Sequence, residues 1–377
     1  MENTHAKPHA IIVKTSTPTE GKDDRDIFTG APASGLDIRY KTVSDGFPLS
    51  FNRLRNLQQF DQGNLHVFPA HMDELVGNLV KEDPSVSCLI ADTFYTSTSW
   101  IAEKYKLVDV SFWTEPALVF TLNYHRDLLV KNGHFASNDN REDTIDYIPG
   151  VKAIEPKDLT TYLQSTDTTA LSHRIICKSF DDVKNADFIL CNTVQQLECD
   201  TILAIQEKQP FYAIGPVFPS EFTKSIVPTS LRADFVASEK SDIEEIAHGL
   251  VLSGVNFIWV LRHDAVSYEK PYTLPLRIEH EIKDQRLIVP LCNQVEVILN
   301  PAIGGFLTHC GWNSIFKSVW CGVPLLCFPL LGGQPTNRKL VVDDWKVGIN
   351  LCDRKPLTRL EVAQKINRLM SRKLAKI

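Results

Sequence analysis

Short runs of β-forming residues alternate with helical patterns along most of this 377-residue chain. This alternation is typical of a parallel sheet covered by helices, and it constrains the fold more than any other feature of the sequence. The strands that we expect are His9–Val13, Asp37–Val43, Ser87–Phe94, Leu107–Trp113, Asp187–Thr193, Phe211–Val217, Val255–Arg262, Arg286–Leu291, Gly304–Cys310, Val323–Phe328 and Val347–Leu351. We therefore predict an α/β protein.

The length of the chain predicts two domains, since a domain has roughly 150 residues. The stretch Pro216–Arg232 contains three prolines and no periodic apolar pattern, which is typical of a connection between domains. We predict a first domain over residues 1–215, a linker over 216–232 and a second domain over 233–377.

Each predicted half lacks part of its opening strand–helix unit. After the first strand, residues 14–35 (KTSTPTEGKDDRDIFTGAPASG) are polar, rich in Gly and Pro, and without a helical pattern. In the second half, the first element after the linker is a helix, which the capping box Ser241-x-x-Glu244 opens and Gly254 closes. No strand pattern precedes this helix.

Composition excludes several classes of protein. The 40 basic and 46 acidic residues give a net charge of −6, so a nucleic-acid partner is not expected. The nine cysteines form no C-x-x-C pair, which argues against a zinc site or a disulfide framework and favours a reducing compartment. The apolar run Ala10–Val13 is too short for a signal peptide, and the uncharged stretch Ser318–Asn337 is interrupted by glycines and prolines. We expect a cytoplasmic protein without a membrane span.

The segment Gly304–Phe316, GGFLTHCGWNSIF, is the sharpest candidate site. A buried strand ends at His309, the chain turns at Gly311, and Asn313 and Ser314 open a helix. Ligands bind beyond the carboxyl ends of strands in open α/β sheets, and a helix N-terminus attracts anions. His309, Asn313 and Ser314 could therefore donate hydrogen bonds to a phosphate. The alternative is that Ser314 only caps the helix and Gly311 only turns the chain.

Asp92 is a second candidate, at the end of the apolar strand that begins at Cys88. A carboxylate at a strand's carboxyl end can be functional, or it can be an N-cap or turn residue; the sequence favours neither. No G-x-G-x-x-G follows a strand and no Walker loop is present, which disfavours a dinucleotide dehydrogenase and a P-loop protein.

The 44-residue segment Leu291–Gln334, LCNQVEVILNPAIGGFLTHCGWNSIFKSVWCGVPLLCFPLLGGQ, resembles the signature box of plant family-1 UDP-dependent glycosyltransferases, and its core HCGWNS is highly specific. Other segments along nearly the whole chain also resemble this family: SDGFP, CLIADTFY, VSFWTEPAL, YIPGV, YAIGPVFP, FIWVLR and TNRKLVVDDWKVGINL. The resemblance implies the GT-B fold, in which two Rossmann-like domains face each other across a cleft. The N-terminal domain would hold the sugar acceptor and the C-terminal domain the UDP-sugar.

The resemblance also implies the chemistry. In this family a histidine after the first strand deprotonates the acceptor hydroxyl, and an aspartate orients it; the oxygen then attacks the anomeric carbon with inversion and expels UDP. The UDP-sugar is a co-substrate, and neither a metal nor another cofactor is expected. By position, Asp92 matches the orienting aspartate. The expected UDP-sugar contacts are Gln294, His309, Gly311, Trp312, Asn313, Ser314 and Gln334.

Four departures from the family pattern bear on activity. The first strand runs straight into Lys14-Thr15-Ser16, so the catalytic histidine and its loop are missing. Leu291 replaces a tryptophan that stacks on uracil, and Lys317 replaces a glutamate that holds the ribose hydroxyls. Gly333 replaces the acidic partner of Gln334, which holds sugar hydroxyls.

Two hypotheses follow. The first is a monomeric UDP-glycosyltransferase that transfers a sugar, glucose being expected, to a hydroxyl of a small apolar acceptor, with impaired activity because the histidine is missing. Four aromatic side chains could line its acceptor site, although ordinary core packing is the commoner role: Phe112, Trp113, Phe120 and Tyr124. The second hypothesis is a truncated, non-catalytic remnant of the family that folds poorly or only binds nucleotide.

Overall fold

The computed structural model describes residues 9–15, 37–48, 50–53, 56–137, 141–217, 240–260, 286–289, 292, 294–352 and 356–371. These residues form two compact units. Unit 1 comprises the described residues of Met1–Val110 and Thr169–Ala186, and unit 2 those of Ser111–Thr168 and Asp187–Ile377. Residues 111–168 thus belong to the same unit as the C-terminal part of the chain. Only residues 216 and 217 of the predicted linker lie within the described residues.

Unit 1 contains a parallel two-stranded sheet of β1 (His9–Thr15) and β2 (Asp37–Val43), in which His9 is opposite Asp37. One helix of this unit begins at Phe68, with a proline in its first turn, and a separate helix precedes it. The helices of this unit are α1 (Leu57–His66), α2 (Phe68–Glu82), α3 (Thr98–Tyr105) and α7 (Leu171–Asp182), followed by the 3₁₀ turn η3 (Val183–Asn185).

A four-stranded sheet has the order β3-β4-β5-β6, and β4 contains the boundary between the units. Its strands are β3 (Cys88–Asp92), β4 (Val108–Trp113), β5 (Phe188–Cys191) and β6 (Phe211–Ala213). In unit 2 the buried helix α4 follows β4. The neighbouring elements of this part are α4 (Ala117–Tyr124), α5 (Arg126–Lys131), η2 (Pro156–Asp158), α6 (Thr161–Gln164) and α8 (Cys199–Gln206).

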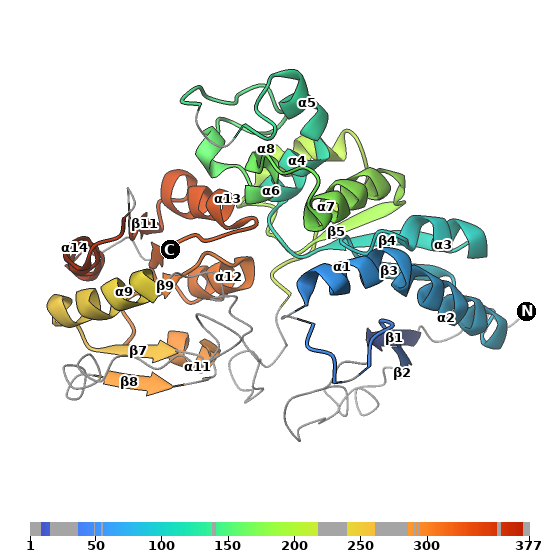
Figure 1. Ribbon diagram of the computed structural model, residues 1–377, viewed down its shortest axis with the longest axis horizontal. Helices are drawn as coiled ribbons and strands as arrows, with labels where there is room; N and C mark the ends of the chain where they lie inside the picture. Colours follow the sequence, from blue (N-terminus) through green and yellow to red (C-terminus); the bar gives the residue numbers. More distant parts are fainter. Residues whose placement is uncertain are drawn as a thin grey trace, which may run out of the picture. The chain divides into compact units, whose positions relative to one another are not determined.

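The C-terminal part of unit 2 holds two more parallel sheets, β7-β8 and β11-β10-β9. Helices α9 and α14 lie side by side (Figure 1), where the Arg359 backbone N–H donates to Glu245 Oε2 at 2.6 Å. The strands are β7 (Phe257–Val260), β8 (Arg286–Val289), β9 (Phe306–Thr308), β10 (Leu325–Cys327) and β11 (Gly348–Asn350). The helices are α9 (Lys240–Ser253), α11 (Gln294–Leu299), α12 (Trp312–Trp320), α13 (Gln334–Lys339), the π-helical η5 (Leu340–Asp344) and α14 (Arg359–Ser371).

All eleven predicted strands are present, most of them shorter at their ends than the patterns suggested. The helical segment after β4 is interrupted at His125, between α4 and α5. One helix prediction was wrong in detail. Ser241 lies inside the first turn of α9 and not before it, although Gly254 ends that helix with a φ of +67° as expected.

The described strands form four sheets where two Rossmann-like domains would have two. A parallel strand is normally buried on both faces, which is why β3 reads as the apolar run CLIAD. Among the described strands β3 lies at one end of its sheet, and the Ile90 side chain is 61% exposed.

No helix of the described residues is long and apolar enough to cross a membrane.

Candidate functional site

The turn after β9 carries the predicted site of unit 2. Cys310 adopts a φ of +69°, a left-handed conformation that costs a residue other than glycine about 1–2 kcal/mol. Two hydrogen bonds hold it there: its N–H donates to Thr308 Oγ1 at 3.1 Å, and its carbonyl accepts from Asn337 Nδ2 at 3.0 Å. The turn is therefore fixed by its surroundings, and it directs the chain into α12.

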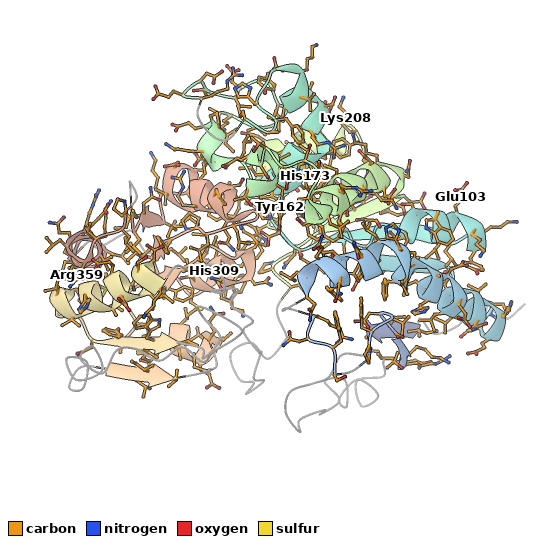
Figure 2. The ribbon with its side chains drawn as sticks, in the orientation of Figure 1. Glu103, Tyr162, His173, Lys208, His309 and Arg359 are labelled. Carbon is orange, nitrogen blue, oxygen red and sulfur yellow. The ribbon has the colours of Figure 1, made fainter. Side chains whose placement is uncertain are left out.

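His309, which is labelled in Figure 2, lies against Gly311 within this turn. A Cβ atom on residue 311 would lie 2.6 Å from Nε2 of His309, closer than real contacts allow, so only glycine fits beside the imidazole. Gly311 is also the N-cap of α12, and its carbonyl accepts the N–H groups of Ser314 and Ile315 at 3.0 and 3.1 Å. The imidazole is thus held at the N-terminus of the helix.

Trp312 belongs to the core. Its side chain is 1% exposed, its Nε1 donates to the Asn192 carbonyl at 2.7 Å, and its ring packs 4.4 Å from that of Phe316. Only the backbone N–H of Trp312 can reach a ligand, because a helix leaves the N–H groups of its first turn without intrahelical acceptors. The side chain of Asn313, next in the chain, is exposed.

Three polar side chains form a chain of hydrogen bonds between α11 and α12. Gln294 Nε2 donates to Ser314 Oγ at 3.2 Å, and Lys317 Nζ donates to Gln294 Oε1 at 3.1 Å. Gln294 and Ser314 are both buried, and burial lowers the pKa of Lys317. The structure therefore brings Gln294 and Ser314 into direct contact, 20 residues apart in sequence.

Gln334 is the first residue of α13. Its Oε1 accepts from the backbone N–H groups of Leu330 and Leu331 at 2.8 and 3.0 Å, so a ligand would meet the donor Nε2. The loop before it is tied to α6, which lies next to α13 in Figure 1, because Thr161 N–H donates to the Gly332 carbonyl at 3.0 Å. The amide is thus presented from a fixed loop.

Sequence reasoning missed Glu115 and Asn337. Asn337 is fully buried, and its Nδ2 donates both to the Cys310 carbonyl and to Glu115 Oε2, at 3.0 Å each. It thereby connects the turn before α12 to the loop between β4 and α4. Both residues lie in segments that carry the family resemblance, VSFWTEPAL and TNRKLVVDDWKVGINL. The resemblance therefore marked these segments but assigned no role to either residue.

Asp92 ends β3 in unit 1, as predicted. Its Oδ1 accepts from the Phe94 N–H at 2.9 Å, which is the geometry of an Asx turn. An N-cap role is excluded, because the next helix begins at Thr98 with Ser97 as its N-cap. Burial raises the pKa of Asp92, and burial together with the charge of Asp92 raises the pKa of Tyr95.

The core role is confirmed for two of the four aromatic residues. Trp113 and Phe120 are 1% and 0% exposed, and their rings pack 5.6 Å apart. Phe112 and Tyr124 are half-buried. Leu291 and most of the loop after β1 lie outside the described residues, so the structure does not describe these departures.

Two further features lie apart from these side chains. Within the part of the chain that the structure describes, no three His, Cys, Asp or Glu side chains gather to hold a metal ion. A hollow of about 400 Å³ shares no residue with the predicted site; it is lined by Val342, Asp343, Lys346, Gly348, Ile349 and Arg368.

Comparison with known sequences identifies the relatives of this chain. The profile of the family "UDP-glucoronosyl and UDP-glucosyl transferase" matches residues 220–376. UDP-glycosyltransferase 86A1 of Arabidopsis thaliana is 56% identical over 382 residues, which cover 94% of this chain and 77% of the relative. UDP-glycosyltransferase 86A2 of the same plant is 50% identical over 392 residues, which cover 98% of this chain and 80% of the relative. Both alignments are longer than the chain, so they place residues of the relatives opposite internal gaps in it.

Solved structures support the fold. The chain is similar to Phytolacca americana UGT2, solved with UDP-2fluoro-glucose and pterostilbene, at a TM-score of 0.75 and 21% identity, covering 96% of this chain and 83% of the other. The chain is also similar to a UDP-glucosyltransferase from Polygonum tinctorium, at a TM-score of 0.75 and 22% identity, covering 97% of this chain and 90% of the other. The expected GT-B class, an α/β fold of two Rossmann-like domains, is confirmed. Sequence and fold together place this chain in the plant family-1 UDP-glycosyltransferases.

Proposed function

We propose that this chain binds a UDP-sugar at the turn His309–Ser314 and transfers glucose, slowly, to a hydroxyl of a small apolar acceptor. The observation that carries the proposal is the built turn itself. The imidazole of His309 is seated over Gly311 at the N-terminus of α12, and Ser314 is bonded to Gln294. The protein would act as a cytoplasmic monomer that needs neither a metal ion nor a further cofactor.

The turn suits a diphosphate for electrostatic reasons. The N-terminus of α12 carries a partial positive charge and N–H donors from its first residues. The His309 ring and the Ser314 hydroxyl would add side-chain donors, and the amide of Gln294, which is buried and bonded to Ser314, would contact the nucleoside. Nε2 of Gln334 would donate to a hydroxyl of the sugar. In this proposal these groups contact the UDP-sugar directly, and no metal ion is needed to neutralise the phosphates.

The transfer requires a base. The acceptor oxygen forms a bond to the anomeric carbon, the bond from that carbon to the β-phosphate oxygen breaks, UDP leaves with the electron pair, and the acceptor proton passes to a protein group. Residues 14–36 contain no histidine, so Asp92 is the carboxylate that we assign to this role. Burial raises its pKa, which makes it a stronger base than an ordinary aspartate. A well-matched base contributes about 10²–10⁴-fold, so transfer should be slower than with a histidine.

The proposal is tested by incubating the recombinant chain with UDP-glucose and a flavonol and measuring the glucoside by mass spectrometry. We expect product above that of a heat-killed control, and less product with Ser314→Ala. Binding of UDP-glucose without product would favour the non-catalytic alternative. The absence of both UDP-glucose binding and glucoside product would refute the proposal.

A further inference from the structure

The carboxylate of Glu115 lies beside the start of α13, close to the groups that we assign to the sugar. A Cβ atom added to Gly333 would lie 3.3 Å from Val119 Cγ2 and 3.5 Å from Glu115 Oε2. Gly333 is the N-cap of α13, and the next residue is Gln334, whose amide is assigned above to a sugar hydroxyl. All three residues belong to unit 2. Because glycine has no side chain, nothing at position 333 stands between α13 and this carboxylate.

The carboxylate of Glu115 is held in place by a hydrogen bond from Asn337. Nδ2 of Asn337 donates to Glu115 Oε2 and to the Cys310 carbonyl, at 3.0 Å each, so the amide orientation is fixed by two acceptors. The Asn337 N–H also donates to the Gly333 carbonyl at 2.9 Å, which places the two residues one helical turn apart. One buried side chain thus connects the turn of the diphosphate, the start of α13 and the carboxylate.

A second observation concerns Asn337, the residue that holds Glu115 in place. Asn337 is fully buried, and its Oδ1 has no hydrogen-bond partner. A buried polar atom without a partner is uncommon in folded proteins, because leaving it unpaired costs free energy. Glu115 itself is half-buried.

We propose that Glu115 binds the transferred sugar, its carboxylate accepting hydrogen bonds from the sugar hydroxyls while Gln334 donates one. This inference rests on the proposed function and defines its donor class. A carboxylate accepts from neutral hydroxyl groups and repels another carboxylate, so the donor is the UDP derivative of a neutral hexose and not of a uronic acid.

The test compares dissociation constants for UDP and UDP-glucose, measured by titration calorimetry on the full chain. Glu115→Gln should weaken UDP-glucose about 10- to 100-fold, the effect of one hydrogen bond to a charged group, and leave UDP unchanged. The double variant Glu115→Gln/Gly333→Asp supplies a carboxylate from the other side and should recover most of this loss. Gly333→Asp alone should give no gain, since two carboxylates would then lie side by side.

UDP-glucuronate provides a third arm. It should bind the wild-type chain more weakly than UDP-glucose does, and the difference should shrink in Glu115→Gln. If Glu115→Gln does not fold, as judged by circular dichroism, Glu115→Asp keeps the charge and should retain part of the preference for UDP-glucose over UDP.

Two results would overturn this inference and leave the proposed function standing. One is an equal weakening of UDP and UDP-glucose, which would mean that Glu115 acts only on the turn through Asn337. The other is an unchanged preference for UDP-glucose over UDP. A wild-type chain that binds no UDP at all would instead overturn the proposed function, and this inference with it.

Discussion

Replacing Lys317 by glutamate is expected to tighten the binding of UDP. In the structure Lys317 Nζ donates to Gln294 Oε1, and Gln294 Nε2 donates to Ser314 Oγ. The Gln294 amide can turn over in the Lys317→Glu variant, so that Nε2 donates to the new carboxylate and Oε1 accepts from the Ser314 hydroxyl. The hydrogen-bond chain therefore survives the change, and an acceptor for ribose hydroxyls is gained at the position where the family has one.

The size of the effect follows from one hydrogen bond between a hydroxyl and a charged group, about 1.5–3 kcal/mol. At 1.4 kcal/mol per factor of ten, UDP should bind about 10- to 100-fold more tightly. Burial, which lowers the pKa of Lys317, also raises the cost of a charge at this position, so the lower part of that range is expected.

Titration calorimetry with UDP and with 2′-deoxy-UDP measures the effect. The gain should be clearly smaller for the deoxy nucleotide, which lacks one of the two hydroxyls. Lys317→Gln is the matched control, because it removes the positive charge without adding a carboxylate, and it should give little of the gain. No tightening in Lys317→Glu, or equal tightening for both nucleotides, would refute the reasoning.

Three further predictions concern the core, catalysis and pH. Trp312→Phe should lower the free energy of unfolding by about 1–3 kcal/mol in urea titrations, because a buried carbonyl loses its donor, and should leave UDP affinity unchanged. Asp92→Ala should abolish glucoside formation; unchanged transfer would show that the assignment is wrong. Burial raises the pKa of Asp45, but hydrogen bonds from Arg53 and the Phe47 N–H outweigh it and the pKa is lowered. Asp45 should therefore stabilise the fold above its unfolded pKa of about 3.9 and lose this effect as pH falls through the lowered value, so the stability difference from Asp45→Asn should shrink between pH 6 and pH 2.5.

The order of strands and helices could be predicted because period and composition are local properties. The apolar run at β3 and the glycine after α9 were sufficient to locate those elements. The break at His125 could not be predicted, because nothing in the apolar pattern around it changes. The separation into four sheets is also not local, since it depends on which strands find a ladder partner.

The candidate site was predicted where its residues are close in sequence. His309, Gly311 and Ser314 lie in one turn, and the pattern located that turn. The contact of Ser314 with Gln294 joins two helices, and that of Asn337 with Glu115 spans 222 residues, so neither follows from spacing. Trp312 was assigned to the diphosphate turn with its neighbours. The structure adds that its side chain lies in the core, because residue 312 is the first residue of an amphipathic helix and faces inward.

A thermal melt of the recombinant chain with and without millimolar UDP-glucose tests most directly whether the nucleotide-sugar site is intact. A ligand that binds only the native state raises its stability, by about 2.7 kcal/mol at a hundredfold excess over the dissociation constant. We predict one cooperative transition whose midpoint rises with UDP-glucose, and a smaller rise for Ser314→Ala. A cooperative transition that UDP-glucose does not move would contradict the account, because the turn around His309 would then be folded without binding its donor.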